Sequence, residues 1–430
     1  MQSKGSSPLV LSRATKPLRG SLSMPGDKSL AHRAALFAAL AEGESVIGNY
    51  PDSGVTRAMR GALNSLGVPS SLEGSVLRIV GNGFRPFPNS GATAYCGNSA
   101  TTIRLLAGAL VGTGSSAILD GSEGLRKRPM DRIVKPLLKM GSSIEATDGH
   151  APLKILPAPL SCIGYDLPVP SAQVLSCLQL AALGASSQSR FTVFAPVRDH
   201  TMRMLNSMGA VIHDYAPDSF VNPLSVPLRP LRCDLPGDIS SAAFIFAAAA
   251  IVPGSRVTVK GIGVNETRTG FLDILAKMGA KISYANRREV MGEPVADVTL
   301  ESASLKGVKV HGDIVVRAID EIPALAAVAA FAEGDTIIRD AEELRYKETD
   351  RIAAIVAQFK ALGAKVWEAR GGFRIRGGTV VGGESAANGD HRIAMMLALV
   401  GLRADVAVEG AEILDESFPG FVSAIDSLRS

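Results

Sequence analysis

The feature that most restricts the fold of this chain is an internal repeat. One pattern, a polar start followed by an apolar helix, a glycine-type break and a strand, recurs at intervals of about 70 residues, long enough for a compact α/β unit. Its six copies begin at Asp27, Asn98, Ser171, Asp238, Asp320 and Asp390. We therefore expect an α/β protein assembled from six similar units.

The helices of these copies are rich in Ala and Leu on all sides. A helix without a polar face is buried, so they are predicted to line domain interiors. Each copy begins with Asp, Asn or Ser, whose side-chain oxygen can cap a helix. After each of these helices the sequence predicts a second helix that ends in Leu or Met and is followed by Gly and a strand. The last copy, from Ala424, is truncated. Two helices with short strands, three times in each half, predict two domains with threefold pseudosymmetry.

At 430 residues the chain is too long for one hydrophobic core, so two domains of roughly 200 residues each are expected. Pro- and Gly-containing stretches near 20–26 and 235–238 are predicted to be hinges between them. One domain would then comprise 24–236, and the other 1–23 together with 237–430. The alternative is a single split near the middle of the chain, with a separate N-terminal arm.

Composition argues against several classes of protein. The formal net charge of +4 is small, and the basic residues are dispersed, which disfavours a nucleic-acid surface but is compatible with small anionic ligands. Apolar runs are too short for a membrane span, and residues 1–20 lack the apolar core of a secretory signal, so we expect a cytoplasmic protein. The four cysteines and six histidines show no CxxC or HExxH spacing, so we expect no disulfide framework and no metal.

Cations accompany several of the helix starts and the loops that face them. A helix N-terminus carries partial positive charge, so added Lys and Arg repel one another unless an anion binds there. This combination is typical of phosphate and carboxylate sites, although any one of these residues could instead be a solvated surface charge. The cations are Lys28, Arg33, Arg128, Arg198, Lys347, Arg351 and Arg392.

Two acidic residues, Asp320 and Glu348, lie among these cations in the sequence. Nearby Arg and Lys favour ionised carboxylates, which suits them to accept a proton or, if desolvated, to donate one. The alternative is that each caps a helix or pairs with a neighbouring Arg. The chain has no GxxxxGK[ST] motif and no nucleophile elbow, so neither nucleoside-triphosphate chemistry nor a serine esterase is supported.

Seven motifs, in order and over the whole chain, resemble the enolpyruvyl transferase family, and within it the members that act on 3-phosphoshikimate. The motifs are PGDKSLAHRA, CGNSATTIRLL, LRKRPMDRI, PSAQVLSCL, VRDHT, LRYKETDRI and GDHRIAMML. The branch that acts on UDP-N-acetylglucosamine is the alternative. That branch has Lys-Asn where Lys28 and Ser29 stand here, and usually a reactive loop cysteine that no cysteine here matches.

The resemblance implies two domains, each of three βαβαββ units, that close on the substrates without a cofactor. The implied reaction joins phosphoenolpyruvate to 3-phosphoshikimate through a tetrahedral intermediate and releases phosphate. A catalytically silent binding protein or ligand sensor of the same fold is the other class of function. We expect a monomer.

The resemblance also implies roles for particular residues. Asp320 would take the proton of the 5-hydroxyl, and Glu348 and Lys28 would transfer protons at the methylene carbon and the bridging oxygen. Phosphoenolpyruvate would be bound by Lys28, Arg128, Arg351 and Arg392, with Gln173 between the two substrates. The residues implied to hold 3-phosphoshikimate are Ser29, Arg33, Ser171, Ala172, Gln173, Arg198 and Lys347. The remaining implied substrate-binding residues are Asn98, Ala100 and Asp320.

Two places depart from the family pattern. Ala100 stands where glyphosate-sensitive members have glycine, and the added methyl group beside the phosphoenolpyruvate site predicts reduced sensitivity to that longer inhibitor. Asp415 and Glu416 stand about where many members have a lysine near the same site. The role of that lysine is then either absent or supplied by another cation.

Overall fold

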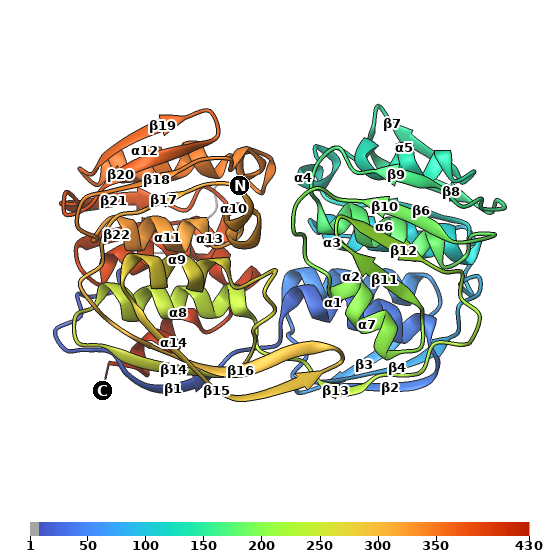
Figure 1. Ribbon diagram of the computed structural model, residues 1–430, viewed down its shortest axis with the longest axis horizontal. Helices are drawn as coiled ribbons and strands as arrows, with labels where there is room; N and C mark the ends of the chain where they lie inside the picture. Colours follow the sequence, from blue (N-terminus) through green and yellow to red (C-terminus); the bar gives the residue numbers. More distant parts are fainter. Residues whose placement is uncertain (1–7, 430) are drawn as a thin grey trace, which may run out of the picture. The chain divides into compact units, whose positions relative to one another are not determined.

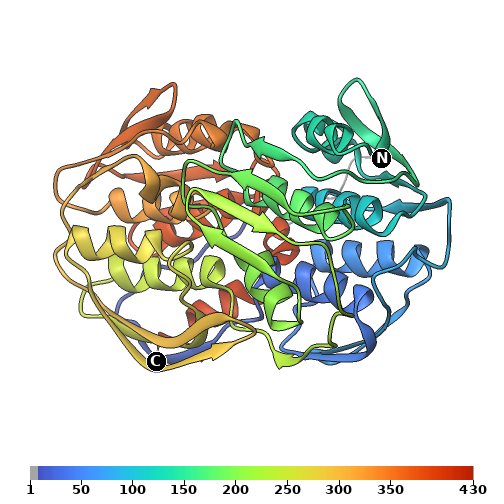
Figure 2. The same ribbon diagram turned by 45° about the vertical axis from the view of Figure 1, so that its right-hand side comes forward.

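The computed structural model describes residues 8–429, which form two compact units (Figures 1 and 2). Within that range, unit 1 comprises 8–25, 237–288 and 294–429, and unit 2 comprises 26–236 and 289–293. Residues 1–7, which belong to the segment predicted to lack a targeting signal, lie outside the described range. No helix within residues 8–429 is long and apolar enough to cross a membrane.

Five four-stranded sheets share one strand order, in which a parallel pair is followed by two antiparallel strands. Unit 2 holds three of them, namely β13(Arg232–Asp234)-β2(Glu42–Gly48)-β4(Val76–Asn82)-β3(Ser70–Glu73), β5(Ala92–Tyr95)-β6(Ala117–Asp120)-β8(His150–Leu156)-β7(Ser143–Thr147) and β9(Gly164–Asp166)-β10(Ser189–Thr192)-β12(Asp218–Val221)-β11(Ile212–Tyr215). Unit 1 holds β1(Arg19–Ser23)-β14(Arg256–Gly263)-β16(Glu293–Glu301)-β15(Lys281–Val290) and β17(Lys309–Val310)-β18(Asp335–Ile338)-β20(Gly372–Arg376)-β19(Lys365–Ala369). Among residues 8–429 the last copy has only the two-stranded parallel sheet β21(Gly382–Ala386)-β22(Asp405–Glu409), which confirms the predicted truncation.

Two sheets are completed by strands that are distant in the sequence. Strand β1 pairs in parallel with β14, with Arg19 opposite Arg256. Strand β13 pairs in parallel with β2, with Arg232 opposite Val46. Each of these sheets is therefore completed by a segment that lies far along the chain from the one that began it.

One long apolar helix from each copy is buried, as the absence of a polar face predicts. Every residue of α8 is buried, and the helices of one unit contact one another. Figure 1 shows α8, α11 and α13 layered between sheets of unit 1. The buried helices are α1(Lys28–Leu40), α3(Ala100–Thr113) and α6(Ala172–Ala182) in unit 2, and α8(Ile239–Ile251), α11(Ile322–Ala329) and α13(His391–Gly401) in unit 1.

The second helix of each copy packs outside the buried one and is amphipathic. Glycines end several of them, such as Gly209 (φ +109°) and Gly279 (φ +111°), in the left-handed conformation that the sequence predicts. These helices are α2(Gly54–Ser65), α5(Asp131–Lys139), α7(His200–Ser207), α9(Gly270–Met278), α12(Arg351–Ala361) and α14(Phe421–Asp426). Short turns of helix complete the chain at α4(Glu123–Arg126), α10(Asp313–Ala318), η1(Glu342–Tyr346) and η2(Ala411–Glu416).

Two of the six predicted helix starts are wrong by one or two positions. In the second copy the cap is Ser99, whose Oγ accepts from the Thr102 N–H (3.1 Å), while Asn98 accepts from Ser122 instead. In the fifth copy α11 starts at Ile322, so Asp320 precedes the helix rather than capping it. Asp320 is thereby left outside the helix for other contacts.

Candidate active site

The predicted substrate-binding residues of unit 2 gather at the starts of its three buried helices. Asp27, Ser99 and Ser171 cap these starts with their side chains. Arg128 and Arg198 are half-buried in the segments that precede α5 and α7, and Asn98 is exposed just before α3. The residues in the first turns, or at the cap itself, are Lys28, Ser29, Ala100, Ser171, Ala172 and Gln173.

Arg33 ties α1 to α6 and α7. Its side chain is only 2% exposed, so the interpretation as a solvated surface charge is wrong for this residue. Its guanidinium donates to Thr201 Oγ1 (2.8 Å), Ser176 Oγ (2.7 Å) and the Ser29 carbonyl (3.0 Å). These hydroxyl and carbonyl oxygens accept from the guanidinium and orient it.

Arg104, which the sequence analysis missed, ties α3 to α6. Its guanidinium donates to Gln173 Oε1 (2.6 Å) and to the Pro129 carbonyl (3.1 Å), next to Arg128. Gln173 in turn donates to Thr101 Oγ1 (2.8 Å). Arg104 stands six positions after Asn98, as Arg33 stands six positions after Asp27, and this shared offset is the signal that could have identified it.

His32, also missed, ties α1 to α3. Its Nδ1 lies 2.6 Å from the Lys28 carbonyl, which can only accept, so Nδ1 carries the proton. Its Nε2 then accepts from the Ser99 hydroxyl (3.3 Å). Burial, with help from the charges of Arg33 and Lys28, lowers the pKa of His32 to about 4, so the ring is neutral at pH 7. Three side-chain links thus join the starts of α1, α3 and α6.

The centre of the unit 1 set is Arg351, at the start of α12 and only 1% exposed. Its guanidinium bonds Asp390, the cap of α13, through Nε (2.7 Å) and Nη2 (3.2 Å), and Glu348 through Nη2 (2.7 Å). Burial by itself lowers the pKa of Arg351, but the nearby Glu348, Asp390 and Asp320 carboxylates raise it above its ordinary value. Burial acts in the opposite sense on Asp390, where Arg351 holds the pKa below its usual range.

Asp320 lies between two cations of this set. Its Oδ1 is 3.2 Å from Lys347 Nζ and 3.8 Å from Arg351 Nη1. Arg392, at the start of α13, donates to the Asp320 backbone carbonyl. The structure therefore links five predicted residues of unit 1 in one network: Glu348 and Asp320 lie beside the buried guanidinium of Arg351, and Lys347 and Arg392 contact Asp320.

A second buried network begins at Glu321, the residue that follows Asp320. Glu321 is fully buried, accepts from the Ser240 hydroxyl and lies 3.8 Å from Arg392. Arg268 donates to the same hydroxyl (2.8 Å), so the starts of α8, α11 and α13 are linked as those of unit 2 are. Asp415 and Glu416 are exposed at the end of η2.

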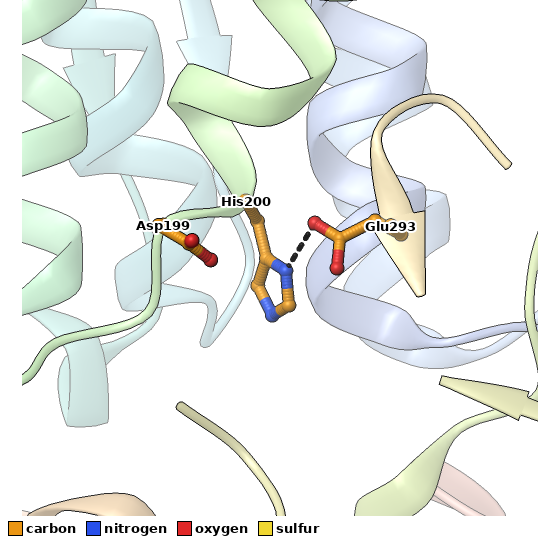
Figure 3. A group of neighbouring side chains, drawn as sticks. All are labelled: Asp199, His200 and Glu293. Carbon is orange, nitrogen blue, oxygen red and sulfur yellow. Dashed lines mark hydrogen bonds and ion pairs between the residues drawn. The ribbon is translucent and has the colours of Figure 1, made fainter. Parts of the chain in front are cut away.

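Within residues 8–429, one group of side chains has the spacing of metal ligands: Asp199, His200 and Glu293 (Figure 3). Hydrogen bonds account for the same arrangement, because His200 bonds Glu293 (2.7 Å) and Asp199 accepts from Arg203 (2.7 Å). The four cysteines are free thiols, with Cys96 and Cys177 buried.

Comparison with known proteins identifies relatives over nearly the whole chain. The model of the EPSP synthase (3-phosphoshikimate 1-carboxyvinyltransferase) family matches residues 12–425. The 3-phosphoshikimate 1-carboxyvinyltransferase of Syntrophomonas wolfei is 42% identical, over 98% of this chain and 99% of its own. That of Geobacter sulfurreducens is 43% identical, over 97% and 98%.

Solved structures agree. An EPSP synthase structure from Acinetobacter baumannii superposes with a TM-score of 0.87 at 37% identity, covering 98% of this chain and 97% of that one. The predicted fold, α/β with two domains each of three βαβαββ units, is thereby confirmed as the enolpyruvyl transferase fold. The chain belongs to the EPSP synthase family.

Proposed function

We propose that this protein transfers the enolpyruvyl group of phosphoenolpyruvate to the 5-hydroxyl of 3-phosphoshikimate, with release of phosphate, as a step of aromatic amino-acid biosynthesis. The observation that carries the proposal is the full-length relationship to 3-phosphoshikimate 1-carboxyvinyltransferases. The chemistry of the two residue sets supports it, because each joins helix N-termini to Arg and Lys, and such combinations favour anions.

In unit 2 the proposed ligands of 3-phosphoshikimate are Ser29, Arg33, Ser171, Ala172, Gln173 and Arg198. The linked starts of α1, α6 and α7 support this role, since a preorganised set of donors loses little entropy when an anion binds. Lys28 and Arg128 are proposed to bind phosphoenolpyruvate, and Asn98 and Ala100 to border it. Gln173, held by Arg104, would lie between the two substrates.

In unit 1 the proposed ligands are Arg351 and Arg392 for phosphoenolpyruvate and Lys347 for 3-phosphoshikimate. We propose that Asp320 takes the proton of the 5-hydroxyl as its oxygen bonds to C2 of phosphoenolpyruvate. A proton is added to the methylene carbon to give the tetrahedral intermediate, and is removed again as phosphate leaves. Glu348 and Lys28 are the proposed groups for these transfers. No cofactor is needed, because bonds are exchanged without oxidation.

Phosphate release tests the proposal directly. Purified protein with phosphoenolpyruvate is assayed with 3-phosphoshikimate, with UDP-N-acetylglucosamine and with unphosphorylated shikimate. Release with 3-phosphoshikimate in strong preference to the others supports the proposal. Release with UDP-N-acetylglucosamine alone would move the chain to the other branch, and binding of both substrates without release would favour a sensor.

Several narrower proposals accompany this function. Ala100, 6% exposed in the first turn of α3, supports reduced sensitivity to glyphosate. The free thiols fit a cytoplasmic protein. We also propose a monomer in which 24–236 and 1–23 plus 237–430 act as two domains that close on the substrates.

A further inference from the structure

The hairpin formed by β15 and β16 starts and ends in unit 1, whereas its tip, residues 289–293, belongs to unit 2. Met291 (φ +52°) and Gly292 (φ +76°) form a two-residue turn with both φ angles positive, as in type I′ hairpins. Met291 packs against the core of unit 2, and its Sδ is 3.0 Å from Cys233 Sγ. A Cβ at Gly292 would lie 3.2 Å from the Arg203 backbone oxygen, so a side chain there would crowd this close approach.

The polar contacts of the tip converge on the first turn of α7. Glu293 Oε1 lies 2.7 Å from His200 Nδ1, and both side chains are at most 3% exposed (Figure 3). Arg203 donates to the Gly292 carbonyl (2.8 Å) and to Asp199 (2.7 Å). Hydrogen bonds between buried groups fix position strongly, because a broken one leaves a buried polar atom unsatisfied.

The start of α7 depends on such outside contacts, because the Asp199 side chain makes no capping bond to the helix. Two residues of the proposed phosphoshikimate set depend on this start. Arg198 precedes His200 by two positions, and Thr201, the next residue of α7, accepts the 2.8 Å bond from Arg33.

We infer that Glu293 is a positioning residue for the anion site of unit 2: through His200 it holds the first turn of α7, and with it Arg198 and Arg33, in the geometry that binds 3-phosphoshikimate. This inference rests on the proposed function, which supplies the ligand. Glu293 does not touch the substrate; it acts through His200. The metal-like spacing of the group is a consequence of the same hydrogen bonds.

Two substitutions of Glu293 test the inference. Glu293→Gln keeps the shape and an accepting oxygen, whereas Glu293→Ala removes the contact. The matched control is Glu301→Gln, at the other end of the same strand, where the carboxylate forms an exposed ion pair with Arg256 (2.9 Å). We expect the KM for 3-phosphoshikimate to rise about tenfold in Glu293→Ala, the effect of losing about 1.4 kcal/mol of binding, and less in Glu293→Gln. In the Glu293 variants, the KM for phosphoenolpyruvate at saturating phosphoshikimate should change less than about twofold. In Glu301→Gln, both KM values should change less than about twofold.

Amide hydrogen exchange without substrate supplies an independent readout. Exchange in 198–207 should become faster in Glu293→Ala and remain unchanged in Glu301→Gln. Unchanged exchange and unchanged KM for phosphoshikimate would overturn the inference, as would equal increases in both KM values. Loss of wild-type activity on treatment with a chelator, with recovery when Zn²⁺ is added, would also overturn the inference in favour of a metal site. If the wild type failed to use 3-phosphoshikimate, the proposed function would fall, while the exchange measurement would still decide whether Glu293 holds α7.

Discussion

Arg33 in unit 2 and Arg351 in unit 1 are equally buried, at 2% and 1% exposure, yet their surroundings differ. Arg33 donates to two hydroxyls and a carbonyl, which orient its charge. Arg351 bonds the carboxylates of Asp390 and Glu348 and lies 3.8 Å from Asp320, so much of its charge is compensated. Oriented charge suits the binding of an anion, whereas a guanidinium shared among carboxylates can bind an anion and also keep those carboxylates ionised where protons are transferred.

The largest expected effect tests the proton-transfer side of this comparison. Asp320→Asn should keep both substrates bound but lose turnover by about 10²- to 10⁴-fold, because the amide cannot accept the hydroxyl proton. Steady-state kcat together with equilibrium binding of each substrate measures this. Asp335→Asn is the control, since Asp335, like Asp320, is paired with two cations of the same unit, here Arg374 and Arg376. Unchanged turnover in Asp320→Asn would remove Asp320 as the base.

The next prediction concerns stability and compares the two arginines directly. Arg351→Gln leaves the fully buried Asp390 without its guanidinium, which should lower the free energy of unfolding by about 3–5 kcal/mol. Arg33→Gln removes the hydrogen bonds to Thr201, Ser176 and the Ser29 carbonyl and should cost about 1–3 kcal/mol. Urea titrations followed by two probes, one for each unit, measure both. Equal losses would show that the different partners do not matter for folding.

Local sequence patterns predicted the buried helices well, because a helix without a polar face can be recognised from its own residues. All thirteen residues of α8, for example, are buried. Four of the six caps were likewise predictable, since capping acts within one helical turn. The pair His200 and Glu293, by contrast, lies 93 positions apart, and the Arg351–Asp390 pair 39 apart. Such contacts depend on how sheets and helices pack, and no local preference of either residue indicates its partner. For the same reason the sequence indicated that Arg351 was important but not that three carboxylates surround it.

The pH dependence of stability tests the link between α1 and α3 in unit 2, which the neutral ring of His32 makes. His32 has a folded pKa of about 4 against an ordinary value of 6.5, so the unfolded chain binds the proton more tightly. Its contribution is present above pH 6.5 and is lost as the pH falls through about 4, a change of about 3 kcal/mol at most. His32→Gln should be less stable at pH 7 but lose less stability between pH 7 and pH 4. His213→Gln, a substitution of an exposed histidine, is the control for replacing a histidine by glutamine.

The smallest expected effect concerns the start of α3, where His32 meets Ser99 and Ala100 follows. Ala100→Gly should lower the inhibition constant for glyphosate by about tenfold, while the KM for phosphoenolpyruvate changes less than about threefold. The asymmetry arises because the removed methyl group would crowd the longer inhibitor more than the substrate. Ala353→Gly, in the first turn of α12, controls for the loss of helix stability that any such change brings. Equal inhibition constants for wild type and Ala100→Gly would mean that the methyl group does not contact the inhibitor, and the start of α3 would then serve to position its neighbours rather than to select the ligand.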